Sequence, residues 1–322
     1  MKYGDSVSSE FRVPSGVPQG SHCGPILFNL FLIDLLQVIK HNRILMYADD
    51  VKVFGRMRTV NDCLLLLLDI DRFFAWCEDN SMDVNVSKCN QISFFRSLNP
   101  LIFQYSIGYE NLKICNEVRD LGILFNTKLS FNSHIQMITS KALKTLGYIN
   151  RLSRELSVGS FKMLCALVRS ILEFGSVVWN PQYEVLIYSL ERVQNKFLRS
   201  VAFRCGYSRE EYTYEELSLV LKSRLNIDSL KNRRTKSDLL FLFRIINGLI
   251  DCSDLIELIH FYASVRRDRF TELFKVPFHR TNYGRNGPIS RILAEANSFS
   301  GLVDFFDVTV NRFKSQLNKM GK

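Results

Sequence analysis

The chain has 322 residues, 47% of them hydrophobic, and carries 42 lysine and arginine residues against 32 aspartate and glutamate residues. This hydrophobic content excludes an intrinsically disordered chain, because there is enough apolar surface to form a core. The net charge of +10 favours a polyanionic partner such as nucleic acid or an anionic membrane surface over plain solubility. Residues 140–245 hold 18 basic and 10 acidic residues, and this concentration of charge favours a binding surface there.

The eight cysteines form no C-x-x-C pair, and none lies near a histidine at zinc-finger spacing, so no structural zinc site is expected. The N-terminus has no hydrophobic signal segment. We therefore expect reduced thiols in an intracellular protein, nuclear or cytoplasmic and not secreted. The apolar stretch 26–39 is interrupted by Asn29, Asp34 and Gln37 and is too short and polar to span a membrane.

The first hundred residues predict short strands around two helices. Residues 1–13 favour a strand, and 15–21 form a loop dense in turn residues. The run 25–40, which starts at a proline, predicts a helix buried on most sides. Residues 43–48 and 51–57 are β-prone runs separated only by Asp49 and Asp50, the spacing of a tight hairpin with both acids at its tip. A leucine-rich helix over 61–79 and a strand over 82–95 follow.

The rest of the chain changes from strand to helix. Residues 102–125 are β-rich, with a turn at Gly108. Apolar positions at three- and four-residue intervals then predict helices over 141–152, 160–173, 185–203 and 228–247. Residues 278–292 are expected to be an irregular connection before a last helix over 305–318. His134, Trp76 and Trp179 are expected to be packing residues.

The adjacent acids Asp49 and Asp50 are the strongest chemical signal in the sequence. Like charges side by side repel, and a divalent cation would relieve the repulsion. Mg²⁺ prefers oxygen ligands and is often held by one or two carboxylates together with substrate phosphates. Alone, such a pair is more often a solvated turn. Here it follows an apolar strand and lies about thirty residues after a Gly-Val-Pro-Gln-Gly-Ser loop, and the three features together favour a metal site.

These motifs resemble the palm of a reverse transcriptase. GVPQGS (16–21) with GPILF (24–28) matches the family's loop and helix, and YADD (47–50) matches its catalytic hairpin. Asn85-x-x-Lys88-Cys89, Leu121-Gly122 and Phe131-x-x-His134-Ile135 match the elements that follow. Lys141-Ala142, Leu172–Gly175 with Trp179-Asn180-Pro181, and Leu190–Arg199 resemble the thumb and C-terminal regions of jockey-type non-LTR retrotransposons. The resemblance covers nearly the whole chain.

The resemblance implies nucleotidyl transfer by two Mg²⁺ ions, with Mn²⁺ as an alternative, on an RNA template, a DNA primer and deoxynucleoside triphosphates. Asp49 is the inherited metal ligand, and Asp50 lies beside it. Gln19 and Gly20 match the loop that lines the nucleotide and template pocket, and Tyr47 belongs to the same pocket. Lys88 matches a lysine near the triphosphate; a surface lysine at a strand edge is the alternative.

The sequence also departs from the family pattern. A complete palm supplies a further catalytic aspartate from a strand upstream of the GVPQGS loop, and that motif, the fingers strands and the preceding endonuclease domain do not occur in this sequence. The chain is therefore expected to be the C-terminal part of such a polymerase. A catalytically inactive nucleic-acid-binding remnant is the main alternative, and a group II intron maturase or telomerase is a weaker one.

The expected fold is α+β. A partial palm, an antiparallel sheet with packed helices, covers 1–125; a helical thumb-like region covers 126–205; and a helical C-terminal extension covers 206–322. On the helix around 190–203, Val193, Phe197 and Val201 share one face. On another face Arg192, Lys196 and Arg199 gather, and we expect them to bind nucleic-acid phosphates, although a solvated helix face is the alternative.

Overall fold

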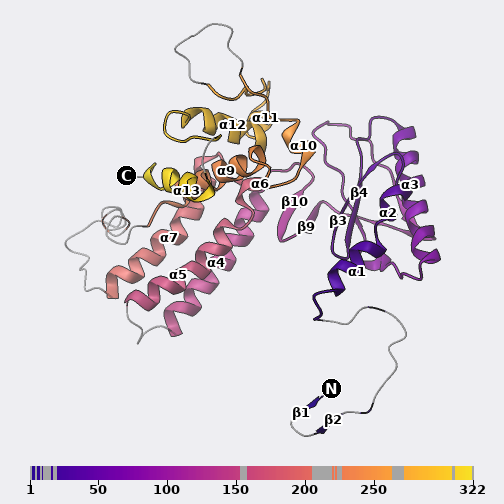
Figure 1. Cartoon of the computed structure of the whole chain (residues 1–322), viewed down its shortest axis with the longest axis horizontal. Coiled ribbons are helices and arrows are strands. Elements are labelled where there is room, and N and C mark those ends of the chain that lie inside the picture. Colours follow the sequence, from indigo (N-terminus) through magenta and orange to yellow (C-terminus); the bar gives the residue numbers. More distant parts are fainter. Residues whose placement is uncertain are drawn as a thin grey trace. The chain divides into compact units, whose positions relative to one another are not determined.

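The computed structural model describes residues 2–3, 6–7, 9, 16, 20–152, 158–204, 220, 222, 227–262, 272–306 and 309–320. The chain divides into two compact units, whose elements are labelled in Figure 1. Unit 1 comprises Met1–Val118 and Asn126–Leu129, and unit 2 comprises Arg119–Phe125 and Ser130–Lys322. Helices and short strands both occur, which confirms the mixed α and β prediction. Among the helices described, none is long and apolar enough to cross a membrane.

Helix α3 (Val60–Asp79) contributes side chains to two apolar clusters of unit 1. Its first turn forms a capping box: the Thr59 hydroxyl accepts a hydrogen bond from the Asp62 amide, and the Asp62 carboxylate accepts one from the Thr59 amide. The predicted helix over 61–79 is confirmed to within one residue. Its buried side chains contribute to two apolar clusters of this unit, and those side chains are Cys63, Leu66, Ile70, Trp76 and Cys77.

The predicted helix over 25–40 is two helices, α1 (Gly24–Phe31) and α2 (Leu35–Val38). The prediction that it is buried on most sides is wrong. Leu32 and Leu35 pack with Trp76 and Cys77 of α3, but no second layer covers the other faces among the residues described. The sequence cannot reveal this exposure. It shows that apolar residues surround the helix axis, but not how many neighbouring elements cover them. The exposed apolar residues are Ile26, Leu27, Leu30, Phe31, Ile33 and Leu36.

The strands form two-stranded sheets throughout the described part of the chain. β1 (Lys2–Tyr3) pairs with β2 (Ser6–Val7). Both lie within the strand predicted over 1–13, most of whose other residues are outside the described ranges. β3 (Arg43–Tyr47) pairs with β4 (Asp50–Phe54), and β5 (Asn90–Gln91) with β8 (Lys113–Ile114). β6 (Ser106–Ile107) pairs with β7 (Glu110–Asn111) around the predicted turn at Gly108. β9 (Glu117–Asp120) pairs with β10 (Ile123–Asn126).

The predicted strand over 82–95 is wrong except at β5. Residues Val86–Lys88 form a 3₁₀ turn instead. The Ser87 hydroxyl donates to Asn85 Oδ1 at 2.6 Å, and the Lys88 amide donates to the Asn85 carbonyl at 3.0 Å. Short-range backbone bonds of this kind replace the bonds to a neighbouring strand.

Three helices of unit 2 surround its first core: α4 (Asn132–Leu152), α5 (Val158–Glu173) and α7 (Glu184–Arg204). All three were predicted, although α4 begins nine residues earlier than expected. The short helix α6 (Ser176–Trp179) follows Gly175, whose φ of 62° is left-handed. A Cβ at Gly175 would lie 2.8 Å from Ile123 Cδ1, so glycine permits both the turn and the close packing. Core members include Leu146, Leu172, Trp179, Leu190, Val193 and Phe197.

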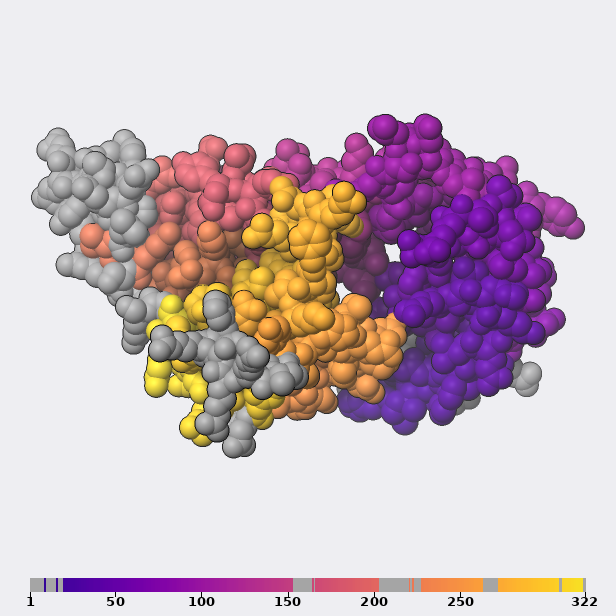
Figure 2. All heavy atoms as spheres, turned by 90° about the horizontal axis from the view of Figure 1, so that it is seen from above, coloured from indigo at the N-terminus to yellow at the C-terminus, as the bar shows by residue number. Residues whose placement is uncertain are grey.

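The second core of unit 2 is formed by α9 (Leu230–Ile246), α12 (Pro288–Ser298) and α13 (Val310–Lys319), with the short helices α10 (Ser253–Ile256) and α11 (Asn282–Arg285) beside them. Phe243 and Phe313 stack with their ring centroids 4.2 Å apart. Figure 2 shows the gold atoms of the C-terminal segments against the orange atoms of the α9 region. The irregular connection expected over 278–292 is wrong, because Thr281 caps α11 and Pro288 occupies the first turn of α12.

Candidate active site

The turn between β3 and β4 carries the two candidate metal ligands. Tyr47 pairs with Asp50, so the two-residue turn is Ala48-Asp49 and the predicted tip, Asp49-Asp50, is displaced by one residue. Ala48 has a φ of 54°, a left-handed conformation that costs an L-residue about 1–2 kcal/mol. Strain of this kind is found at functional sites more often than elsewhere.

Both carboxylates of the turn are exposed to solvent, and neither carboxylate has a hydrogen bond or ion pair with another described residue. Two free carboxylates fit part of the ligand set of Mg²⁺, which prefers oxygen donors and retains several waters or substrate oxygens. The described residues contain no group of three acids, histidines or cysteines that could hold a metal ion. The turn therefore offers two candidate oxygen ligands for a metal ion.

One face of the β3–β4 hairpin rests on the rest of unit 1. Ile44 and Met46 of β3 pack against the cluster of Leu32, Leu35, Trp76 and Cys77, and Phe28 of α1 packs against the same cluster. The alternation of β3 leaves Arg43, Leu45 and Tyr47 on the exposed face. The shared cluster joins the helix after the glycine-rich loop to the hairpin that bears the acids. The predicted nucleotide-pocket residue Tyr47 is 64% exposed beside the turn.

Asp69 of α3 anchors the loop that leads into β3, and the sequence analysis missed it. Its fully buried carboxylate accepts hydrogen bonds from the amides of Lys40, His41 and Asn42 at 2.9–3.1 Å, from Asn42 Nδ2 at 3.0 Å and from Arg72 Nη1 at 2.9 Å. Burial alone would raise the pKa of Asp69, but the hydrogen bonds, that of Asn42 foremost, outweigh it and lower the pKa.

The sequence does contain a signal for this anchor. Asp69 follows five consecutive leucines, and it stands next to Ile70 and three residues after Leu66, both of them buried. An aspartate in such a position needs hydrogen-bond donors from elsewhere in the chain. The backbone amides that it binds lie 27 to 29 residues away, so the sequence alone does not identify them.

The predicted nucleotide-binding residues outside the hairpin are only partly placed. Gln19 lies outside the described residues. Gly20 is exposed and has a φ of 79°, a conformation that glycine adopts readily. Beyond it the Ser21 hydroxyl accepts a hydrogen bond from the Gly24 amide at 3.0 Å, at the start of α1. Lys88 is exposed at the end of the 3₁₀ turn, near Val86, which packs against the same core cluster as Val53 of β4.

The candidate phosphate-binding residues lie on α7. Val193, Phe197 and Val201 are buried, which confirms the predicted packing face. Arg192 and Lys196 are exposed. Arg199 is partly buried, and its Nε donates to the Asn195 carbonyl at 3.3 Å. The structure therefore leaves two of the three predicted cations fully available to solvent.

His134 and Trp179 are buried against each other, as expected of packing residues. Their ring centroids are 5.2 Å apart in an edge-to-face arrangement. The Leu124 amide donates to His134 Nδ1 at 3.2 Å, and Trp179 Nε1 donates to the Phe174 carbonyl at 2.9 Å. Burial, aided by Arg119, lowers the pKa of His134 to about 4. Trp76, also predicted to pack, is buried in unit 1.

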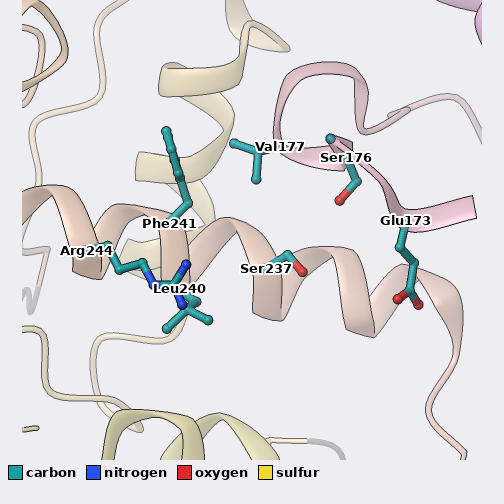
Figure 3. A pocket seen from close by; sticks show the side chains of 8 residues that line it. Glu173, Ser176, Val177, Ser237, Leu240, Phe241 and Arg244 are labelled. Atoms are coloured by element: carbon teal, nitrogen blue, oxygen red, sulfur yellow. The ribbon is translucent and has the colours of Figure 1, made fainter. Parts of the chain in front are cut away.

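A cavity of about 260 Å³ lies between α6 and α9 in unit 2 (Figure 3). The carboxylate of its lining residue Glu173 is already engaged by the guanidinium of Arg233, through Nη2 at 2.8 Å and through Nε. None of the predicted site residues lines it. The lining residues are Glu173, Gly175, Ser176, Val177, Ser237, Leu240, Phe241 and Arg244.

Comparison with known proteins gives consistent matches over the first half of the chain and beyond. Residues 3–149 match the family described as reverse transcriptase (RNA-dependent DNA polymerase). The chain is 25% identical over 230 residues to a probable RNA-directed DNA polymerase from transposon X-element of Drosophila melanogaster, covering 68% of this chain and 25% of that protein. It is 26% identical over 229 residues to the RNA-directed DNA polymerase from mobile element jockey of the same species, covering 64% and 24%.

A third relative is the retrovirus-related Pol polyprotein from type-1 retrotransposable element R1 of Nasonia vitripennis, 22% identical over 209 residues, or 59% of each chain. No solved structure matches the chain. The chain spans about a quarter of the length of the two Drosophila polymerases. Residues 3–149 thus match the reverse transcriptase family, and the chain resembles, at low identity, RNA-directed DNA polymerases of insect mobile elements including jockey.

Proposed function

We propose that this chain is the C-terminal part of an RNA-directed DNA polymerase of a jockey-type non-LTR retrotransposon. The observation that carries the proposal is the exposed pair Asp49 and Asp50 at a strained β-turn, inside the segment that matches the reverse transcriptase family. The proposed arrangement is a partial palm over 1–125, a thumb over 126–205 and a C-terminal extension over 206–322. The proposed partners are an RNA template, a DNA primer and deoxynucleoside triphosphates, inside the cell.

In this proposal each group of residues has its own task. Two Mg²⁺ ions, when bound, activate the primer 3′ hydroxyl and neutralise the leaving pyrophosphate. Asp49, with Asp50 beside it, supplies oxygen ligands at a turn whose strand is fixed on α3 through Ile44 and Met46. Gln19, Gly20 and Tyr47 line the pocket for the nucleotide and template, and Lys88 lies near the triphosphate. Arg192, Lys196 and Arg199 bind phosphates of the nucleic acid.

A second candidate function is a catalytically inactive protein that binds nucleic acid. It is favoured by one observation: the described residues hold no group of three potential metal ligands. Phosphoryl transfer by two metal ions depends on ligands that fix both ions, and two carboxylates on one turn are a weak set. The basic surface of α7 would keep its role in either case.

Primer extension by the purified chain, with an RNA template and Mg²⁺ or Mn²⁺, separates the two functions. We expect at most trace synthesis, because no third carboxylate joins Asp49 and Asp50 among the residues that the structure describes. Asp49→Asn should abolish any trace that occurs, whereas Asp71→Asn, at an exposed position of α3, should leave it unchanged. Robust synthesis that survives Asp49→Asn would contradict the proposed role of the turn.

A further inference from the structure

A stripe of exposed residues runs along α4, apart from every residue assigned above. Lys141, Lys144, Tyr148 and Arg151 are all exposed. Their spacing of three, four and three residues places them within an arc of about 80° of the helix and along about 15 Å of its length. The buried face carries Ala142, Leu146 and Ile149 instead, so the stripe faces away from the core of unit 2.

The charge of this stripe is unbalanced. Helix α4 contains no acidic residue, and Lys141, Lys144 and Arg151 form no ion pair with any residue that the structure describes. The basic residues of neighbouring segments are different, because acids already neutralise several of them. Those pairs are Lys222 with Glu191, Lys231 with Glu184, Arg233 with Glu173, and Lys236 with Asp228. Three cations in a row on a helix, with no acidic partner in the described part of the chain, favour a polyanion.

Tyr148 favours a single-stranded nucleic acid over a duplex as the polyanion. Its side chain is 58% exposed and stands between Lys144 and Arg151 on the same face. Single-stranded nucleic acids bind surfaces that combine cations for the phosphates with aromatic rings on which bases stack. A duplex keeps the faces of its bases inside the stack and offers a ring such as Tyr148 little to bind.

We propose that the α4 stripe binds a single strand of RNA or DNA, with one base stacked on Tyr148 and the neighbouring phosphates on Lys141, Lys144 and Arg151. This inference rests on the proposed function, which supplies a single-stranded template, but it concerns a surface distinct from α7 and from the acidic turn. The stripe would hold template that is not yet paired with primer.

The test is fluorescence anisotropy with the full chain and three probes of equal strand length: a single-stranded oligonucleotide, an abasic strand with the same phosphates, and a duplex. The single strand is also measured at rising salt. Tyr148→Ala should weaken single-strand binding about five-fold or more, while Tyr148→Phe keeps it. The abasic strand should not distinguish Tyr148→Ala from the parent. Replacing Lys141, Lys144 and Arg151 with alanine should flatten the dependence on salt, because fewer counterions are released.

Tyr109→Ala is the matched control, since Tyr109 is fully exposed on unit 1 and should leave binding unchanged. Circular dichroism and thermal melting confirm that each variant is folded. The proposal is overturned if Tyr148→Ala binds the single strand as the parent does, if the stripe variants weaken duplex binding more than single-strand binding, or if anionic vesicles bind with the same dependence on the stripe.

Failure of the proposed function would look different. In that case Asp49→Asn would leave primer extension unchanged, while the anisotropy results for α4 would stand. Conversely, an Arg192→Ala/Lys196→Ala variant that reproduces the whole effect of Tyr148→Ala on single-strand binding would assign the site to α7 and remove it from α4.

Discussion

At the scale of single residues, the chain buries charge where the sequence shows only an ordinary helix pattern. Asp238 of α9 is fully buried, accepts a hydrogen bond from Asn180 Nδ2 at 2.8 Å and pairs with Arg291 of α12. Burial raises the pKa of Asp238 to about 6, against the opposing effect of Arg291. These partners lie more than fifty residues apart along the chain, so no local pattern predicts their contact.

Glu295, in the same region, provides a prediction about pH. Burial, with the nearby Asp238, raises its pKa to about 7 from an ordinary value of 4.5. A raised carboxyl pKa means that the folded state holds a proton that the unfolded state has released, so stability from this group is full below pH 4.5 and is lost as pH rises through 7. Glu295→Gln should therefore raise the free energy of unfolding at pH 8 by roughly 1–3 kcal/mol, and should change it little at pH 4.

Urea denaturation of the parent and the variant at both pH values measures this difference. Glu257→Gln is the control, because Glu257 is exposed and should shift neither value. If Glu295→Gln changes the free energy of unfolding equally at pH 4 and pH 8, the pKa of Glu295 is not raised in the folded state.

At the scale of elements, the sequence predicted helices well and strands poorly. The helices α3, α5, α7 and α9 end within about two residues of expectation, because each has a strong apolar period and clear ends. The strand expected over 82–95 failed because the amides of Val86, Lys88 and Cys89 donate to carbonyls two or three residues earlier instead of to a neighbouring strand. The exposure of α1 could not be foreseen, since the sequence shows how apolar a helix is but not what covers it.

The candidate site was also predicted only in part from the sequence. The motif placed Asp49 and Asp50 at a hairpin, and the structure confirms the hairpin with its turn displaced by one residue. The roles of Gln19, Gly20, Tyr47 and Lys88 remain predictions, because they came from the resemblance and concern ligands. Asp69 was missed, although it fixes the chain immediately before β3.

Asp69→Asn tests how the loop before β3 is held. Asparagine has one acceptor oxygen, so it cannot replace both carboxylate oxygens, and some amides among Lys40, His41 and Asn42 lose their partner. We expect a loss of about 1–3 kcal/mol in the free energy of unfolding of unit 1. Hydrogen exchange at the three amides should become faster, whereas Asp71→Asn on the exposed side of α3 should change neither quantity. Unchanged exchange in Asp69→Asn would show that the loop is held by other contacts.

At the scale of the whole molecule, two units carry different parts of the proposed function. Unit 1 holds the acidic turn and the helix after the glycine-rich loop, and unit 2 holds the basic helices α4 and α7. Variants of the two units should therefore have different defects. Removing positive charge from α4 or α7 should weaken the binding of nucleic acid. Substitution of Asp49 should stop synthesis without weakening binding.

We propose that Asp49 is a metal ligand of a polymerase whose other catalytic carboxylate belongs to a segment preceding the GVPQGS loop. The most direct measurement is primer extension by a fusion that places the fingers strands and the upstream aspartate of a jockey-type polymerase before Met1. We expect template-dependent synthesis that needs both Asp49 and the upstream aspartate. Asp49→Asn should reduce the rate about a thousand-fold, a loss of several kcal/mol of transition-state stabilisation, and Asp50→Asn should reduce it less. A folded Asp49→Asn fusion that extends primers at the parental rate would show that Asp49 is not a metal ligand of the polymerase.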